Sequence, residues 1–168
     1  PQAYLGGLLI LLSGAAVVVG RQILRVRRDE SALARLESLQ RDGEQSVADL
    51  YELGSVQLRK RLYGQATETL KRAAKRASDE PAEARALIEN ALGFSLAAQS
   101  NYSAAIRHYR SALQAKADYP VALNNLAFAL EKQQKAQEAR DTYQKVLELD
   151  GSNKTAQKRL KRLDKLAA

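Results

Sequence analysis

The sequence predicts an all-α protein in which a single N-terminal transmembrane helix precedes three repeated helix pairs and a C-terminal capping helix. Three observations predict this fold. The 168-residue chain is rich in alanine, leucine, lysine, arginine, glutamate and glutamine and holds only 3 prolines, a composition that favours helix nearly throughout. No charged residue occurs from Pro1 to Gly20. In the remainder of the chain, one pattern of small and apolar residues recurs.

The apolar run at the start of the chain predicts a membrane anchor. A helix rises about 1.5 Å per residue, so roughly 20 residues cross a hydrocarbon core of about 30 Å. Tyr4 to Gly20 is at the short end of that length, and apolar residues between the arginines that follow can extend it. A soluble core helix would carry a polar stripe, and a signal peptide would place positive charges before its apolar segment. Both alternatives are therefore disfavoured.

The arginines that follow the run set its orientation. They are Arg21, Arg25, Arg27 and Arg28. Because positive charges flank membrane helices on the cytoplasmic side, the rest of the chain is expected there or in an organellar equivalent. We expect residues 1–28 to form an anchor with an arginine-rich junction, in contact with membrane lipid. Residues 29–46 are expected to form a helical connector.

The rest of the chain repeats itself. The segments "LYELGSVQLRKRLYGQATETLKRA", "ENALGFSLAAQSNYSAAIRHYRSA" and "LNNLAFALEKQQKAQEARDTYQKV" begin at Leu50, Glu89 and Leu123. The interval between the first two starts is slightly longer than the interval between the last two, so a short insertion falls around Pro81. The small residues that align are Gly54, Gly93 and Ala127, followed in each segment by Ala66, Ala105 and Ala139.

The last two segments repeat with a period of about 34 residues, which is the period of the tetratricopeptide repeat. Each unit has a small residue at its eighth position and alanine at its twentieth, and this pattern also resembles that family. In the family each unit is two antiparallel helices that pack closely at the small residues. The resemblance implies a repeat domain over 47–168, with units at 47–80, 86–119 and 120–153 and a cap at 154–168. Gln57 and Glu89 depart from the usual residues, which weakens individual boundaries and not the architecture.

The resemblance also implies a concave groove lined by the first helix of each unit. Asn90 and Asn124 share one repeat position, and their amides can donate to and accept from a peptide backbone. Phe94 and Phe128 share another and can pack on an apolar side chain of a partner. Packing of both rings against neighbouring helices is the open alternative. The implied groove residues are Tyr51, Glu52, Ser55, Arg59, Asn90, Phe94, Asn124, Asn125, Phe128 and Lys132.

Several function classes are disfavoured. The chain has no cysteine and one histidine, His108, so no catalytic, metal or cofactor site is expected. Tetratricopeptide proteins that hold chaperone C-termini use a clamp of lysine, asparagine and arginine, and here only Asn125 matches it. The basic residues after Asn153 could contact anionic lipid or nucleic acid. No aromatic residues interleave with them, which favours a solvated cap and no nucleic-acid partner.

The layout of the whole chain resembles one family more closely. The anchor "YLGGLLILLSGAAVVV", the junction "RQILRVRR" and three repeat units in so short a chain are similar to the photosystem I assembly factors of cyanobacteria and plastids, the hypothetical chloroplast frame thirty-seven family. This resemblance implies a single-pass thylakoid protein whose repeats face the cytoplasm or stroma. Its implied partners are photosystem I subunits or assembly intermediates. Other tethered scaffolds, such as an organelle import receptor or a bacterial envelope assembly protein, are the main alternatives.

Overall fold

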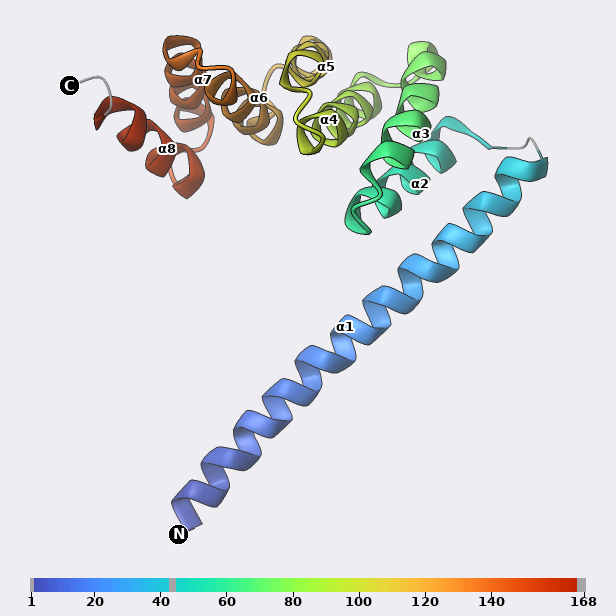
Figure 1. The fold of residues 1–168 in the computed structure, drawn as a ribbon, viewed down its shortest axis with the longest axis vertical. Coiled ribbons are helices and arrows are strands. Elements are labelled where there is room, and N and C mark those ends of the chain that lie inside the picture. The colour runs from blue at the N-terminus through green and yellow to red at the C-terminus, as the bar shows by residue number, and fades with distance from the viewer. Residues whose placement is uncertain (1, 43–44, 166–168) are drawn as a thin grey trace. The chain divides into compact units, whose positions relative to one another are not determined.

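The computed structural model describes residues 2–42 and 45–165, with side chains described for residues 11–39 and 45–165. The chain divides into two compact units, Pro1–Glu44 and Gln45–Ala168. All regular structure in the described residues is helical, which confirms the all-α prediction (Figure 1). The helices are α1 (Gln2–Asp42), α2 (Val47–Arg59), α3 (Tyr63–Arg76), the 3-10 turn η1 (Ala77–Asp79), α4 (Ala82–Ala98), α5 (Tyr102–Ala115), α6 (Pro120–Lys132), α7 (Ala136–Leu149) and α8 (Lys154–Lys165).

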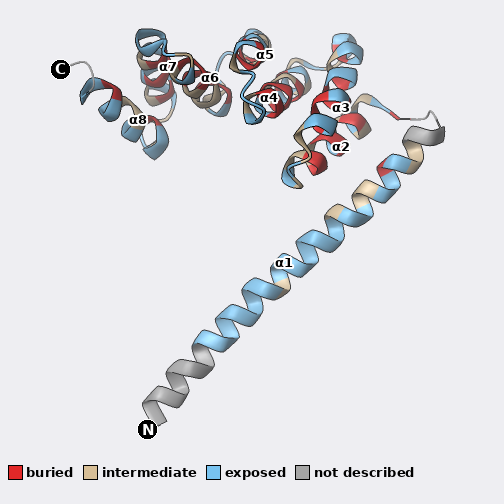
Figure 2. Ribbon diagram, viewed as in Figure 1, coloured by how far each residue is buried: buried red, intermediate tan, exposed pale blue. Residues whose placement is uncertain are grey.

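The first unit consists of α1, a single helix of 41 residues that joins the predicted anchor and the predicted connector. From residue 11 onward most of its side chains are exposed (Figure 2). Apolar side chains are exposed as well, among them Leu11 at 72% and Val18 at 68%.

The predicted transmembrane anchor is not supported by this structure. Within the residues it describes, no helix is both long enough and apolar enough to cross a bilayer. Of the residues that precede Arg21, only those from Leu11 to Gly20 have described side chains. The earlier part of the apolar run lies outside the residues whose side chains are described.

The second unit is built from successive helix pairs. α2 packs on α3, α4 on α5 and α6 on α7, and α3, α5 and α7 each also pack on the helix that follows (Figure 1). Local chemistry sets where these helices start. Ser46 and Asp49 form a capping box at α2, with the Asp49 amide donating to Ser46 Oγ at 3.1 Å. Pro120 occupies the first turn of α6, where no backbone N–H is needed.

The small residues of the repeat allow paired helices to approach closely. A Cβ built on Gly54 would lie 2.6 Å from the Leu70 side chain, and one on Gly93 would lie 2.7 Å from the Tyr109 ring. Leu70 and Tyr109 are buried, so neither can move away freely. The repeated alanines are fully buried in all three pairs: Ala66, Ala105 and Ala139.

Each helix pair turns through one residue in the left-handed conformation. Arg61 has φ 60°, Ser100 has φ 62° and Gln134 has φ 61°. The backbone N–H of the next residue reaches back to the first helix, as Asn101 does to the carbonyl of Leu96 at 2.9 Å. These turns therefore close the first helix with the bond pattern of a Schellman motif, although none of them uses glycine.

The second unit ends in α8, which packs on α7. Ala156 and Leu163 are buried and Leu160 is half-buried against the core that runs through the repeats. Leu166 continues the spacing of Leu160 and Leu163 in the sequence and lies outside the described residues. The apolar side of α8 is therefore occupied by its packing on the last helix pair.

Candidate functional site

The predicted groove residues lie on the first helices of the three pairs. We call the surface formed by these ten residues the first-helix face. Figure 1 shows α4 and α6 as neighbouring members of the helix row, and the two helices contact each other. The ten members of the first-helix face are Tyr51, Glu52, Ser55 and Arg59 on α2, Asn90 and Phe94 on α4, and Asn124, Asn125, Phe128 and Lys132 on α6.

A chain of side-chain amides connects α4 with α6. Asn125 Nδ2 donates to Asn90 Oδ1 at 3.0 Å, and Asn90 Nδ2 donates to the Tyr119 hydroxyl at 3.3 Å. Tyr119 directly precedes α6. Burial raises the pKa of the Tyr119 hydroxyl, the nearby Tyr51 raises it further, and the Asn90 bond lowers it. An amide has two N–H donors and a carbonyl that accepts twice, so Asn90 retains capacity for a partner.

Asn124 repeats the same relation one unit later. Its Nδ2 donates to Asn153 Oδ1 at 3.3 Å, and that oxygen also accepts from the Ala156 N–H at 3.1 Å at the start of α8. Asn124 Oδ1 is buried and has no hydrogen-bond partner in the described residues. The side chains at this repeat position thus hold the beginning of the next first helix.

The two phenylalanines differ although they share a repeat position. Phe94 is 45% exposed. Phe128 is half-buried: Tyr102 meets its ring edge-on with centroids 6.5 Å apart, Lys132 Nζ lies 5.4 Å from the centroid, and Arg159 Cζ lies 5.0 Å from it.

Once the helix pairs are stacked, the residues at equivalent repeat positions explain this difference. Ala98 and Asn125 stand one repeat period before Lys132 and Arg159, at the equivalent places around Phe94. Neither alanine nor an asparagine bonded to Asn90 supplies a cation for the ring. Phe94 is therefore the more available of the two for a partner.

The α2 members of the face are less uniform. Tyr51 is half-buried and packs against the core, and Ser55 is half-buried. Glu52 and Arg59 are exposed. At the repeat position where α4 and α6 carry Asn90 and Asn124, α2 carries Tyr51, which has no amide.

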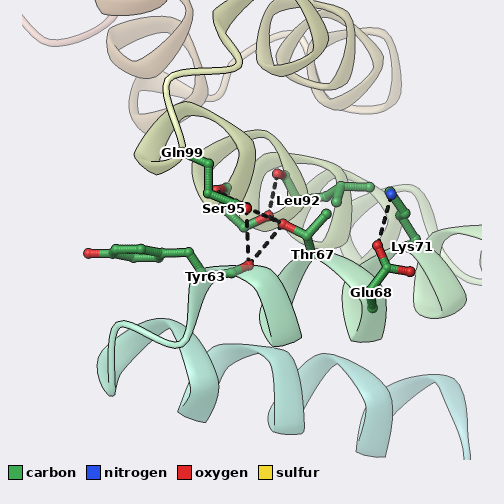
Figure 3. A network of polar contacts seen from close by, with 7 residues as sticks. All are labelled: Tyr63, Thr67, Glu68, Lys71, Leu92, Ser95 and Gln99. Atoms are coloured by element: carbon green, nitrogen blue, oxygen red, sulfur yellow. Dashed lines mark hydrogen bonds and ion pairs between the residues drawn. The ribbon is translucent and has the colours of Figure 1, made fainter.

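A buried polar network between α3 and α4 was not predicted (Figure 3). Thr67 Oγ1 lies 2.9 Å from both Ser95 Oγ and the Tyr63 carbonyl, and Ser95 Oγ donates to the Leu92 carbonyl at 2.7 Å. Gln99 Nε2 donates to Thr67 Oγ1 at 2.8 Å. The network joins the first pair to the second through satisfied hydroxyls. Helical periodicity alone does not distinguish such hydroxyls from core residues.

Two further groups of side-chain contacts also depend on the tertiary structure. Glu131, whose side chain is only 9% exposed, pairs with Arg159 at 3.2 Å and with Arg162. The Tyr143 hydroxyl donates to its other oxygen at 3.4 Å. His108 Nδ1 lies 2.7 Å from Glu89 Oε2, which links α5 to α4.

Comparison with known proteins places this geometry among repeat proteins. A tetratricopeptide repeat model matches residues 96–163. The ycf37 protein of Guillardia theta is 30% identical over 160 residues, which is 95% of this chain and 90% of that protein. The chloroplastic tetratricopeptide repeat domain-containing protein PYG7 of Arabidopsis thaliana is 32% identical over 157 residues, 94% of this chain. The chain spans about half the length of the Arabidopsis protein, 52%.

A solved structure shares the repeat architecture. It is the first tetratricopeptide domain of Spaghetti (RPAP3), bound to an HSP90 peptide, which superposes with a TM-score of 0.66 at 20% identity. The match covers 73% of this chain and 96% of that one. The fold is therefore that of a tetratricopeptide domain. Tetratricopeptide domains, the family whose model matches residues 96–163, are non-enzymatic scaffolds that generally bind peptides and proteins.

Proposed function

Because this chain belongs to the ycf37 family of tetratricopeptide repeat proteins, we propose that it is an interaction scaffold that helps photosystem I subunits assemble or stay assembled. Its partner is a segment of a photosystem I subunit or of an assembly intermediate, held on the first-helix face. The identity of the partner is inferred from the family resemblance. The choice of the first-helix face as the binding surface is inferred from the repeat register.

The exposure of Phe94 is the observation that carries the choice of surface. A phenylalanine that is 45% exposed leaves apolar area in water, and covering it with a partner is favourable. Asn90 lies one helix turn from Phe94 on α4, and Asn125 lies on α6. Both side-chain amides can form hydrogen bonds in addition to the one between them. An aromatic anchor beside amide groups suits an extended peptide, whose backbone needs donors and acceptors.

The proposed location is the stromal or cytoplasmic face of the thylakoid membrane. The Arabidopsis relative is named as chloroplastic. The exposed apolar side chains of α1, followed by Arg21, Arg25, Arg27 and Arg28, support attachment of the first unit to an anionic membrane surface. Membrane fractions from a photosynthetic host should therefore contain the protein, and recovery only in the soluble fraction would contradict this location.

A pull-down from solubilised thylakoids tests the proposed function. The wild-type chain should retain photosystem I subunits. Phe94→Ala should weaken that capture about tenfold, because burying a phenylalanine is worth roughly 1.5–3 kcal/mol. Leu149→Ala is the matched control, since Leu149 is 50% exposed but lies at the end of α7, away from the first-helix face.

Three outcomes separate the possibilities. Loss of capture with Phe94→Ala and not with Leu149→Ala supports the first-helix face. Normal capture by Phe94→Ala excludes it. Recovery of subunits of another membrane complex, with no photosystem I subunit, excludes the proposed partner.

A further inference from the structure

The C-terminal helix carries a concentration of positive charge that the proposed function leaves unused. α8 contains six basic residues and one acidic residue, Asp164. Asp164 points its carboxylate to Arg140 on α7, 3.1 Å from Nε, so it does not neutralise the rest of the helix. The basic residues line an open hollow of about 710 Å³ on the surface of α8. It is lined by Lys154, Thr155, Lys158, Arg159, Lys161, Arg162 and Lys165.

Two of these cations are held in place by a single buried carboxylate. Glu131 on α6 pairs with both Arg159 and Arg162. One negative charge facing two guanidinium groups leaves a net positive charge at a fixed position. A preorganised guanidinium binds a carboxylate better than a mobile one, because less conformational entropy is lost on binding.

This charge adjoins the end of the first-helix face. Arg159 on α8 and Lys132 on α6 approach the same Phe128 ring, at 5.0 Å and 5.4 Å. Two like charges gathered at one ring repel each other, and an anion placed between them relieves the repulsion. The first-helix face thus ends in a group of cations that contact the Phe128 ring.

The lysines of α8 remain available to a ligand. Lys154, Lys158 and Lys161 are exposed, and no carboxylate of the described residues pairs with them. By contrast, the apolar side of the helix is already used, since Ala156 and Leu163 are buried in the core. Insertion of a helix into the bilayer interface needs a free apolar face as well as basic residues. In the described part of α8 the apolar residues are buried or half-buried, and its cations adjoin the first-helix face at Phe128, which favours an acidic protein segment as the ligand.

We propose that the α6–α8 end of the first-helix face binds an acidic protein segment. The carboxylates of this segment contact Lys158, Lys161 and the two arginines that pair with Glu131, which are Arg159 and Arg162. This inference rests on the proposed function, because it names the chemistry of the partner segment. An apolar residue of the segment would extend toward Phe94, and its run of aspartate or glutamate would follow toward α8.

Fluorescence anisotropy with the purified chain of residues 1–168 tests the proposal. The probe is a labelled synthetic peptide with one phenylalanine followed by six glutamates, and the matched peptide carries glutamines instead. The wild-type chain should prefer the glutamate peptide by at least about tenfold, and salt should weaken this preference. Lys158→Gln with Lys161→Gln should lower the affinity about fivefold, as expected for two exposed charges.

The control is a variant with the same change in net charge elsewhere. Lys75→Gln with Lys145→Gln removes two exposed lysines from α3 and α7. It should bind the glutamate peptide as the wild type does. Equal binding of the two peptides, or equal losses for both double variants, would overturn the proposal.

Two further readouts separate this inference from its alternatives. If vesicles of phosphatidylglycerol bind through Lys158 and Lys161 and the glutamate peptide does not, the site is a lipid site and the inference is wrong. If the peptide result holds and photosystem I capture fails, the acidic-segment site stands and the proposed partner is wrong. If capture holds and the peptide shows no charge preference, the proposed function stands and this inference is wrong.

Discussion

Asn90 donates a hydrogen bond from its side-chain amide to the hydroxyl of Tyr119, at 3.3 Å and across 29 residues of sequence. Asn124 donates to Asn153 across the same 29-residue interval. At this repeat position, α4 is therefore joined to the start of α6, and α6 to the start of α8. The asparagines predicted to meet a partner also hold neighbouring repeats together, which couples the stability of the unit to the shape of the first-helix face.

A double-mutant cycle measures this link. Asn90→Ala and Tyr119→Phe each remove one side of the bond, and the pair should show a coupling energy of about 0.5–1.5 kcal/mol in urea unfolding. Asn124→Ala combined with Tyr119→Phe is the control, because the Asn124 amide donates to Asn153 and not to Asn90 or Tyr119. Additive effects of Asn90→Ala and Tyr119→Phe would show that the bond does not contribute.

Gly93→Ala tests the close approach of α4 and α5. The added methyl group would meet the buried Tyr109 ring at 2.7 Å, so the variant should lose about 1–3 kcal/mol of unfolding free energy. Gly64→Ala on α3 is the matched control, since nothing lies within 4 Å of its added Cβ. It should gain up to about 1 kcal/mol through the better helix propensity of alanine. Equal effects of the two substitutions would contradict the described packing.

Ser100→Gly should stabilise the second unit. Ser100 sits at φ 62° in the turn between α4 and α5, where a side chain costs roughly 1–2 kcal/mol and glycine does not. Part of that gain is offset by the greater freedom of glycine in the unfolded chain, so a net increase of about 0.5–1 kcal/mol is expected. Ser100→Ala keeps the Cβ and should give no gain. A melting midpoint that rises equally for both variants would rule out backbone strain as the cause.

Tyr109 should make the fold sensitive to alkaline pH. Burial raises the pKa of its hydroxyl above the ordinary value of 10.0. The neutral form is favoured in the folded state, so its contribution is complete below about pH 10. As the pH rises further, the unfolded chain ionises first, and stability should fall by about 1.4 kcal/mol per pH unit for this group. Tyr109→Phe should flatten the fall measured by urea unfolding.

Tyr143 offers a check on that prediction. Burial raises the pKa of its hydroxyl too, although the charge of Arg159 lowers it in part. Tyr143→Phe should therefore reduce the alkaline loss in the same direction. Curves for both variants that run parallel to the wild type would show that these tyrosines do not control the pH dependence.

Much of the second unit could be predicted from sequence because its signals are local. The spacing of Gly54, Gly93 and Ala127 indicates where helices pack closely, and the structure places Leu70 and Tyr109 against those glycines. Capping chemistry is local as well, as the Ser46 and Asp49 pair shows. The predicted anchor rests on the apolar run and the arginines that follow it, and no helix in the described part of the chain has the length and apolarity that an anchor requires.

The sequence by itself determined the helical repeat and the register that assigns Asn90, Phe94, Asn124 and Phe128 to two equivalent positions. Only the tertiary structure decided which of these side chains remain free for a partner. Phe128 is enclosed by Tyr102 and Arg159, whereas Phe94 is left 45% exposed. The physical reason is that periodicity follows from the geometry of one helix. Exposure depends on neighbours about one repeat away, which meet only when the pairs stack.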